Sequence, residues 1–276
     1  MPELLITGIS GFLGRAVARR AAREGWTVAG TYLAHEPPLG VAADRLDIRD
    51  RGAVAELFAA RHPTAVVHTA YRRGGDDAPA VNADGAGHVA AAARAAGARL
   101  VHVSSDAIFR GDLGRALRED DRPDPATPYG ATKAAAETAV AAAHPAALMV
   151  RTSLLYGGPG RAPGPHEEAA LAAARGEQAM TFFDDEIRCP VQVDDLAAAL
   201  VELAATTPAG PLHVAGADPV DRATFARLIV AAAGLDPATI ASGPRGPDRA
   251  GDCTLDCGAA RGLLRSRIRG VREVLR

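Results

Sequence analysis

The chain has 276 residues, of which 48% are hydrophobic and 23% charged, and its formal net charge is −2. This balance is typical of a globular protein, and it offers neither a basic block for nucleic acid nor an apolar run long enough for a membrane. No basic leader precedes the N-terminal apolar residues, so we expect a cytoplasmic protein. Three cysteines without a CxxC pair, and histidines without metal spacing, predict free thiols and no metal site.

The first predicted elements are a strand, a glycine-rich turn, a helix and a second strand. Apolar residues 4–6 predict a buried parallel strand, and residues 26–32 predict its neighbour. A helix from about Arg15 to Gly25 would point its N-terminal N–H groups at a phosphate. The turn before it contains Gly8, Gly11 and Gly14. This order predicts a dinucleotide-binding unit, whose glycines allow a tight turn and close approach to a pyrophosphate.

Strands and helices then continue to alternate. The pattern predicts strands over 45–48, 65–70, 99–104 and 147–152, and helices over 51–61, 80–96 and 129–143. Right-handed crossovers between such strands build a doubly wound parallel sheet. We therefore expect an α/β fold of the Rossmann type, with its NAD(P)-binding core in residues 1–155.

The composition of the sequence changes after Tyr156. Residues 157–165 contain too much glycine and proline for regular structure. They could be a plain connector, but loops beyond the strand ends of such sheets are where substrates bind. Residues 156–276 alternate helices with short strands, and we expect a smaller substrate-binding lobe with elements that return to the core.

Tyr129 and Lys133 lie four residues apart in a predicted helix, so their side chains share one face. An ammonium beside a phenol lowers the tyrosine pKa from its usual value near 10, which makes the tyrosine a usable acid or base. A hydroxyl from the strand end at Ser104 and Ser105 could hold the substrate oxygen. The spacing alone also fits a half-buried tyrosine with a solvated lysine. Together with the glycine-rich turn, it predicts proton transfer coupled to hydride transfer.

These residues resemble the extended short-chain dehydrogenases/reductases, and within them the dTDP-4-dehydrorhamnose reductase group, which also contains sugar-nucleotide-binding homologues. The resemblance runs along nearly the whole chain. It rests on residues 7–14, 103–111, 129–133, 150–157 and 185–196.

The resemblance implies a role for each matching residue. Tyr129 would be the general acid, Lys133 would lower its pKa and bind the nicotinamide ribose, and Ser105 rather than Ser104 would orient the carbonyl. Implied cofactor contacts come from Gly8, Ser10, Gly11, Phe12, Leu13, Gly14, Tyr32, Asp47, Ile48, Ala70, Tyr71 and Lys133. Implied substrate contacts come from Ser105, Asp106, Ala107, Tyr129, Leu154 and Arg188.

Three positions depart from the pattern of the rhamnose-forming members. Ala107 and Leu154 stand where those members carry aromatic residues that resemble sugar contacts. The pocket therefore need not hold the family's usual sugar. Arg188 replaces a glycine found in many members, and it could meet a diphosphate or be an exposed structural arginine.

The expected function is NAD(P)H-dependent reduction of a ketone, foremost that of a 4-keto-6-deoxy nucleotide sugar. No acidic residue follows the second strand before Glu36, whereas Arg15 and His35 could face a 2′-phosphate, so NADP is favoured over NAD. Two alternatives stay open: a non-catalytic NAD(P)-binding regulatory subunit of a partner enzyme, and an epimerase or dehydratase that recycles its NAD. A homodimer is expected by family analogy alone.

Overall fold

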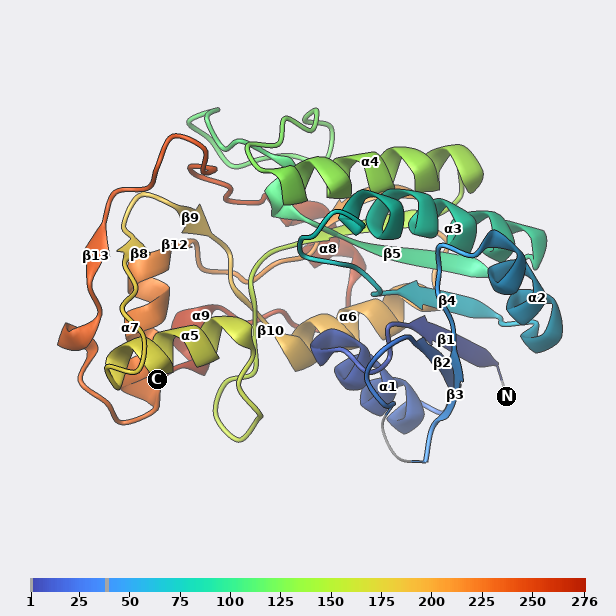
Figure 1. The fold of residues 1–276 in the computed structure, drawn as a ribbon, viewed down its shortest axis with the longest axis horizontal. Coiled ribbons are helices and arrows are strands. Elements are labelled where there is room, and N and C mark those ends of the chain that lie inside the picture. The colour runs from blue at the N-terminus through green and yellow to red at the C-terminus, as the bar shows by residue number, and fades with distance from the viewer. Residues whose placement is uncertain (1, 38–39) are drawn as a thin grey trace.

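The computed structural model describes residues 2–37 and 40–276 (Figure 1). Within them, seven parallel strands form a sheet in the order β11–β6–β5–β4–β1–β2–β3. These strands are β1 Glu3–Thr7, β2 Thr27–Tyr32, β3 Ala42–Arg45, β4 Ala65–His68, β5 Arg99–Ser105, β6 Leu148–Thr152 and β11 Gly210–His213. The strand order reverses beside β1, and ligands of such sheets bind beyond the carboxyl ends of the strands at that point. The expected Rossmann-type fold is confirmed.

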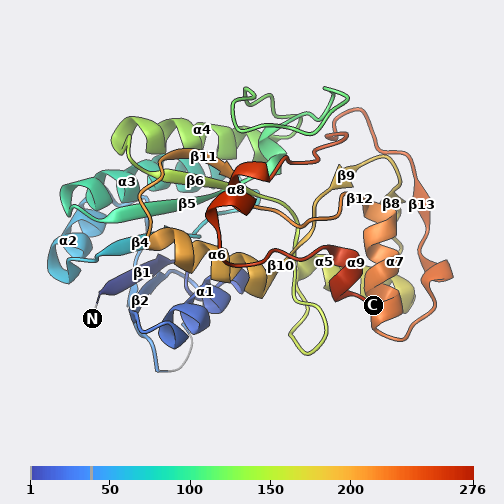
Figure 2. The same cartoon turned by 180° about the vertical axis from the view of Figure 1, so that it is seen from behind.

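Helices cover both faces of this sheet, as the two opposite views show (Figures 1 and 2). The helices α1 Phe12–Arg23 and α6 Val193–Ala204 pack on one face, and α2 Arg51–Arg61, α3 Gly85–Ala95 and α4 Pro128–Ala143 pack on the other. Successive residues of β1 alternate between the two cores, since Leu4 and Ile6 join the first and Leu5 the second. Burying one such side chain contributes roughly 1.5–3 kcal/mol.

Most elements after residue 155 form a second group, at the left of Figure 1. A core around Tyr156 and Phe225 joins α5 Pro165–Ala174, α7 Arg222–Ala232 and α9 Val271–Val274. Three two-stranded ladders lie around it. They pair β7 Leu155–Tyr156 with β10 Val191–Gln192, β8 Phe182–Phe183 with β13 Ser242–Gly243, and β9 Ile187–Arg188 with β12 Val220–Asp221.

The chain returns to the central sheet twice after residue 155. Helix α6 packs against α1, and β11 pairs with β6, so the outermost strand on that side comes from residues 210–213. A short helix, α8 Gly258–Leu263, lies close to β11. The remaining short turns are a π-helix over Ala80–Asp84 and 3-10 helices over Asp106–Ile108 and Pro237–Thr239.

Three predicted boundaries were wrong by three residues or more. The first helix starts at Phe12 rather than Arg15, because Gly11 already has the extended backbone of an N-cap. The third strand ends at Arg45 instead of starting there, because only Leu46 N still bonds to Tyr32 O and Asp47 opens a turn. The predicted helix over 80–96 begins with the π-helical turn and is α-helical only from Gly85.

No helix in the described parts of the chain is long and apolar enough to cross a membrane. Cys189, Cys253 and Cys257 are free and buried, as their odd number and spacing predicted.

Candidate active site

A cavity of about 370 Å³ lies beyond the carboxyl ends of β1, β5 and β6, against the second group of elements. Its walls bring together many of the predicted site residues. These are Gly11, Phe12, Leu13, Gly14, Tyr71, Ser105, Asp106, Ala107, Tyr129, Lys133, Leu154 and Arg188. Segments separated by more than 170 residues thus face one space.

The glycine-rich turn has the shape that a pyrophosphate needs. Gly8 has φ +71°, and a Cβ added there would lie 2.9 Å from the backbone nitrogen of Ala70. A Cβ on Gly14 would clash with the carbonyl oxygen of Gly8. Helix α1 starts with no side-chain cap and no acidic residue in its first turn, so its first N–H groups can receive a phosphate. These residues fit a dinucleotide.

Six predicted cofactor residues lie outside the cavity wall. Gly8 and Ala70 pack on each other behind the glycine-rich turn, and the other four are Ser10, Tyr32, Asp47 and Ile48. Asp47 binds Arg49 through two hydrogen bonds of 3.0 Å to Nε and one of 2.5 Å to Nη2. This pairing lowers the pKa of the Asp47 carboxyl.

Arg15 ties the glycine-rich turn to the segment after β2. Its Nε donates to the Ser10 carbonyl at 2.8 Å, and Nη2 donates to the Glu36 carbonyl at 3.1 Å. The guanidinium is therefore held at the end of the second strand, where a Rossmann fold places the adenosine ribose.

Local geometry brings Tyr129 up to the strand that carries Ser105. Thr127 caps α4 by accepting a hydrogen bond of 3.1 Å from Gly130 N, and Pro128 begins the helix. Gly130 touches the loop after β5 so closely that a Cβ would clash with the Ala107 carbonyl. The first turn of α4, with Tyr129 in it, consequently lies against the end of β5.

The pKa of Tyr129 is raised, not lowered. Burial is the main cause, and the charges of Tyr71 and Asp106 add to it, while a hydrogen bond with Ser105 and the charge of Arg73 oppose it. Tyr129 therefore stays protonated at neutral pH, and burial makes it a weaker proton donor than a free tyrosine.

Lys133 is buried in the cavity wall, with 4% of it exposed. Its Nζ donates to the carbonyl of Val103 at 2.6 Å, and burial lowers the pKa of the ammonium to about 8. The lowering of the tyrosine pKa by this lysine, which its spacing suggested, is therefore not the dominant effect at Tyr129.

Asn82 holds the loop that carries Tyr71 over the site. Its Oδ1 accepts from Arg72 N at 2.7 Å, and its Nδ2 donates to Arg72 O at 2.7 Å and to Thr132 Oγ1 at 2.9 Å. This buried amide, in the π-helical turn, fastens the loop to α4. The Tyr71 and Tyr129 rings consequently lie 6.0 Å apart between centroids.

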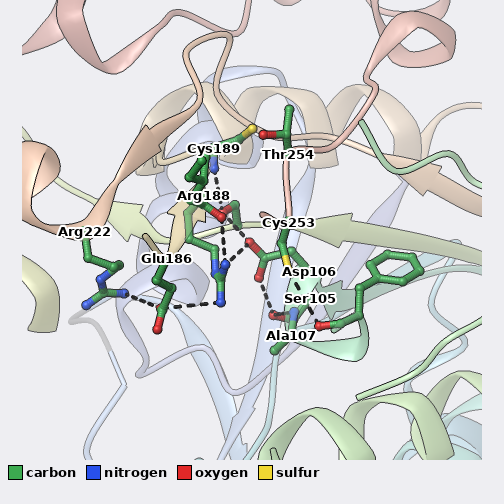
Figure 3. A network of polar contacts seen from close by, with 12 residues as sticks. Ser105, Asp106, Ala107, Glu186, Arg188, Cys189, Arg222, Cys253 and Thr254 are labelled. Carbon is green, nitrogen blue, oxygen red and sulfur yellow. Dashed lines mark hydrogen bonds and ion pairs between the residues drawn. The ribbon is translucent and has the colours of Figure 1, made fainter. Parts of the chain in front are cut away.

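A buried network of charges begins next to Ser105 (Figure 3). Ser153 Oγ donates to Asp106 Oδ2 at 2.5 Å, and Ser105 Oγ donates to Oδ1 at 3.2 Å. Arg188 Nε lies 3.7 Å from Asp106 Oδ2, and its Nη2 lies 3.4 Å from Glu186 Oε1. Burial raises the pKa of Asp106, while the charge of Arg188 and the two hydroxyls hold it down.

Arg188 is not the exposed arginine that was one of the two sequence-based alternatives. Only 6% of it is exposed, and its Nη1 donates to the carbonyls of Ile187 at 2.7 Å and Gly251 at 2.8 Å. The guanidinium supports the cavity floor with most of its donors already engaged.

Several cavity residues were not predicted. They are Thr69, Arg73, Thr127, Ser153, Pro165, His166, Glu186, Arg222, Arg249 and Ala250, together with wall residues from the strand ends. Arg222 opens an ordinary amphipathic helix, and nothing in its neighbouring sequence distinguishes it from a solvated arginine. Only the pairing of β12 with β9 places it beside Glu186.

The chain matches the family described as RmlD substrate binding domain over residues 2–276. It belongs to this family. A dTDP-4-dehydrorhamnose reductase from Streptomyces griseus is 35% identical over 253 residues, which cover 87% of this chain and 79% of the relative. The expected membership of the extended short-chain dehydrogenases/reductases is thereby confirmed, and with it the class of NAD(P)-dependent reductases.

The chain is similar to two further proteins. Methionine adenosyltransferase 2 subunit beta from Bos taurus is 33% identical over 162 residues, which cover 56% of this chain and 47% of that protein. A dTDP-4-dehydrorhamnose reductase from Bacillus anthracis in complex with NADP has the same fold. Its TM-score is 0.84 at 24% identity, and the match covers 100% of this chain and 97% of that one.

Proposed function

We propose that this protein reduces the ketone of a 4-keto-6-deoxy nucleotide sugar with a reduced nicotinamide cofactor. One observation carries the proposal: Ser105, Tyr129 and Lys133 line the same cavity as the glycine-rich turn. The family and its reductase members support the same chemistry. A bound nicotinamide would supply the hydride.

In this proposal, the residues of the chain hold the reactants and move the proton. Gly8 and Gly14 let the turn pack closely on Ala70 and on the start of α1, whose first N–H groups would bind the pyrophosphate. Tyr129 is protonated at neutral pH, and it would give this proton to the carbonyl oxygen as the hydride arrives. Ser105 accepts from Ala107 N at 3.2 Å, which fixes its hydroxyl at the strand end, where it would orient the carbonyl.

We infer that NADP(H) is the preferred cofactor and that NAD(H) is the weaker one. No acidic residue lies between Tyr32, where β2 ends, and Glu36, and the carbonyls of Ser10 and Glu36 hold Arg15 at this strand end. The Bacillus anthracis structure contains NADP. Steady-state rates with NADPH and NADH test this preference.

Replacement of Tyr129 by Phe tests the reductase directly. The variant lacks the transferable proton but keeps the ring, so we expect turnover to fall by at least about 100-fold. Binding of NADPH, followed by its fluorescence, should stay at the wild-type level. A panel of 4-keto nucleotide sugars serves as substrate, and wild-type turnover in Tyr129→Phe would contradict the proposal.

A second candidate is a cofactor-binding subunit without turnover, which the similarity to methionine adenosyltransferase 2 subunit beta favours. Capture of a partner enzyme whose activity this chain changes, together with no turnover on the panel, would identify it. The presence of Ser105, Tyr129 and Lys133 in one cavity favours the reductase, since binding alone needs no proton donor.

We also propose that residues 1–155 bind the cofactor and that residues 156–276 supply much of the substrate side. His166 and Arg222, which lie in the cavity wall, support this division. The three free cysteines suit the reducing cytoplasm, where we place the protein. A homodimer stays a prediction, which analytical ultracentrifugation would test.

A further inference from the structure

Basic side chains outnumber acidic ones in the cavity wall. Among the described residues, five basic side chains line the cavity but only two acidic ones. The basic residues are Arg73, Lys133, Arg188, Arg222 and Arg249, and the acidic ones are Asp106 and Glu186. A confined space with one sign of charge attracts a ligand of the opposite sign.

The two carboxylates are already used by two of the arginines. Asp106 and Glu186 flank Arg188, at 3.7 Å and 3.4 Å (Figure 3). Glu186 Oε2 also accepts from Arg249 Nε at 3.0 Å, and it forms an ion pair with Arg249 Nη2 at 2.8 Å. Arg188 and Arg249 are therefore compensated within the protein.

Arg222 lacks such compensation. Its nearest carboxylate oxygen belongs to Glu186 at 4.0 Å, and that carboxylate is shared with the two other guanidiniums. The adjacent Asp221 caps α7 instead, accepting from Thr224 N at 2.7 Å and from Thr224 Oγ1 at 2.6 Å. The hydrogen bond of Arg222 in this region is a long one, 3.5 Å, to His166 Nδ1.

Arg222 is also largely withdrawn from water. Its side chain is 14% exposed, and burial lowers the pKa of the guanidinium to about 10. Burial and the charges of Arg222 and Arg73 lower the pKa of His166 to about 3, so this imidazole stays neutral and adds no charge. Keeping a poorly solvated cation without a full ion pair costs free energy of folding. An anionic ligand that completes the ion pair offsets this cost.

We infer that Arg222 is the anchor for an oxyanion of the substrate, a phosphate or a carboxylate, and that it selects anionic ketones. This inference rests on the proposed function, since the anion and the ketone must belong to one molecule. The backbone fixes the anchor, because Arg222 N donates to Glu186 O at 3.1 Å beside the β12–β9 pairing. The planar guanidinium can hold two oxygens at once, and Arg73 adds charge at the same wall.

Arg222→Gln tests the anchor, and Arg227→Gln is its matched control on the same helix. Arg227 binds Ser242 Oγ at 2.9 Å and does not line the cavity. Calorimetry on the full chain saturated with NADPH measures binding of dTDP, inorganic pyrophosphate, UDP-glucose and UDP-glucuronate. NADPH affinity of both variants should equal that of the wild type, which also shows that they fold.

If the anion is a phosphate, Arg222→Gln lowers the affinity for dTDP and pyrophosphate by about tenfold or more, whereas the Arg227→Gln variant keeps the wild-type affinity for both. If it is a carboxylate, dTDP binding persists, and the variant loses a wild-type preference for UDP-glucuronate over UDP-glucose. Wild-type affinities in Arg222→Gln for all four probes, or no binding of any probe by the wild type, would overturn the inference. Arg222-dependent binding without turnover on the ketone panel would instead refute the reductase alone.

Discussion

Lys133 is a cation enclosed by protein, and its chemistry differs from that of a lysine in water. Burial lowers the pKa of its ammonium to about 8, while the neighbouring carboxylate of Glu137 opposes the change. The ammonium is therefore present below about pH 8 and lost above it. Tyr129 keeps its proton throughout this range because burial raises its pKa.

We expect the rate of ketone reduction to fall as the pH rises through about 8. Profiles of kcat/KM between pH 6 and 10 would show the fall. In the Lys133→Arg variant the guanidinium keeps its proton over the whole interval. The kcat/KM of its residual activity should therefore not decrease above about pH 8. An unchanged limb near pH 8 in that variant would assign the titration to another group.

At the scale of elements, the contact between α4 and the end of β5 decides where Tyr129 lies. Gly130 makes this contact possible, since any side chain would clash with the Ala107 carbonyl. We expect Gly130→Ala to destabilise the fold by about 1–3 kcal/mol and to reduce turnover, because α4 must move away. Urea unfolding and steady-state rates measure the two effects.

Gly262→Ala in α8 is the control for this substitution. No heavy atom lies within 4 Å of the Cβ that it would add, so its stability should stay equal or rise by up to about 1 kcal/mol. Equal stability and turnover of the Gly130 and Gly262 variants would show that the close contact does not constrain α4.

The elements that sequence periodicity located well are those with local end signals. The predicted helix over 51–61 is α2 to the residue, because Asp50 caps its start by accepting from Ala53 N and His62 leaves it with φ 49°. The strand predicted at 45–48 was displaced, because the alternation of Leu46 and Ile48 continues after the ladder has ended.

The residues of the candidate site also fall into those that a local sequence motif predicts and those that only tertiary contacts bring to the cavity. The glycine-rich turn and Tyr129 with Lys133 are short motifs, so their sequence spacing carries their geometry. Arg222 and Arg249 reach the cavity through tertiary pairing with a segment some 35 to 65 residues earlier, around Glu186. No local pattern encodes that pairing, and the sequence could not reveal it.

At the scale of the whole molecule, buried histidines make the free energy of unfolding depend on pH. His68 and His102 stack 5.1 Å apart beneath α4, and each is 1% exposed. Burial lowers the pKa of His68 to about 3 and that of His102 well below its usual range. Below pH 6.5 the unfolded chain binds protons at these residues and the folded chain does not, so stability falls as the pH falls.

We expect the free energy of unfolding to drop by roughly 1 kcal/mol per fully buried histidine between pH 7.5 and 5.5. Urea unfolding at both values measures it. His102→Leu removes one of these titrating groups and should make the drop smaller, whereas replacement of the exposed His35 by Gln should leave it unchanged. An equal drop in His102→Leu and the wild type would contradict this account.

The return of the chain to the central sheet after residue 155 has a consequence for how this protein can evolve. The polypeptide crosses between its two groups of elements several times, since β11 extends the sheet and α6 covers one of its faces, while α5 and α7 line the cavity. A cut after Leu155 would leave β6 with an unpaired edge and α1 without its partner. Mutations that change the substrate side of the cavity therefore act on the same folding unit that binds the cofactor. If such a mutation is destabilising, it lowers the stability of the whole chain and not of one lobe alone.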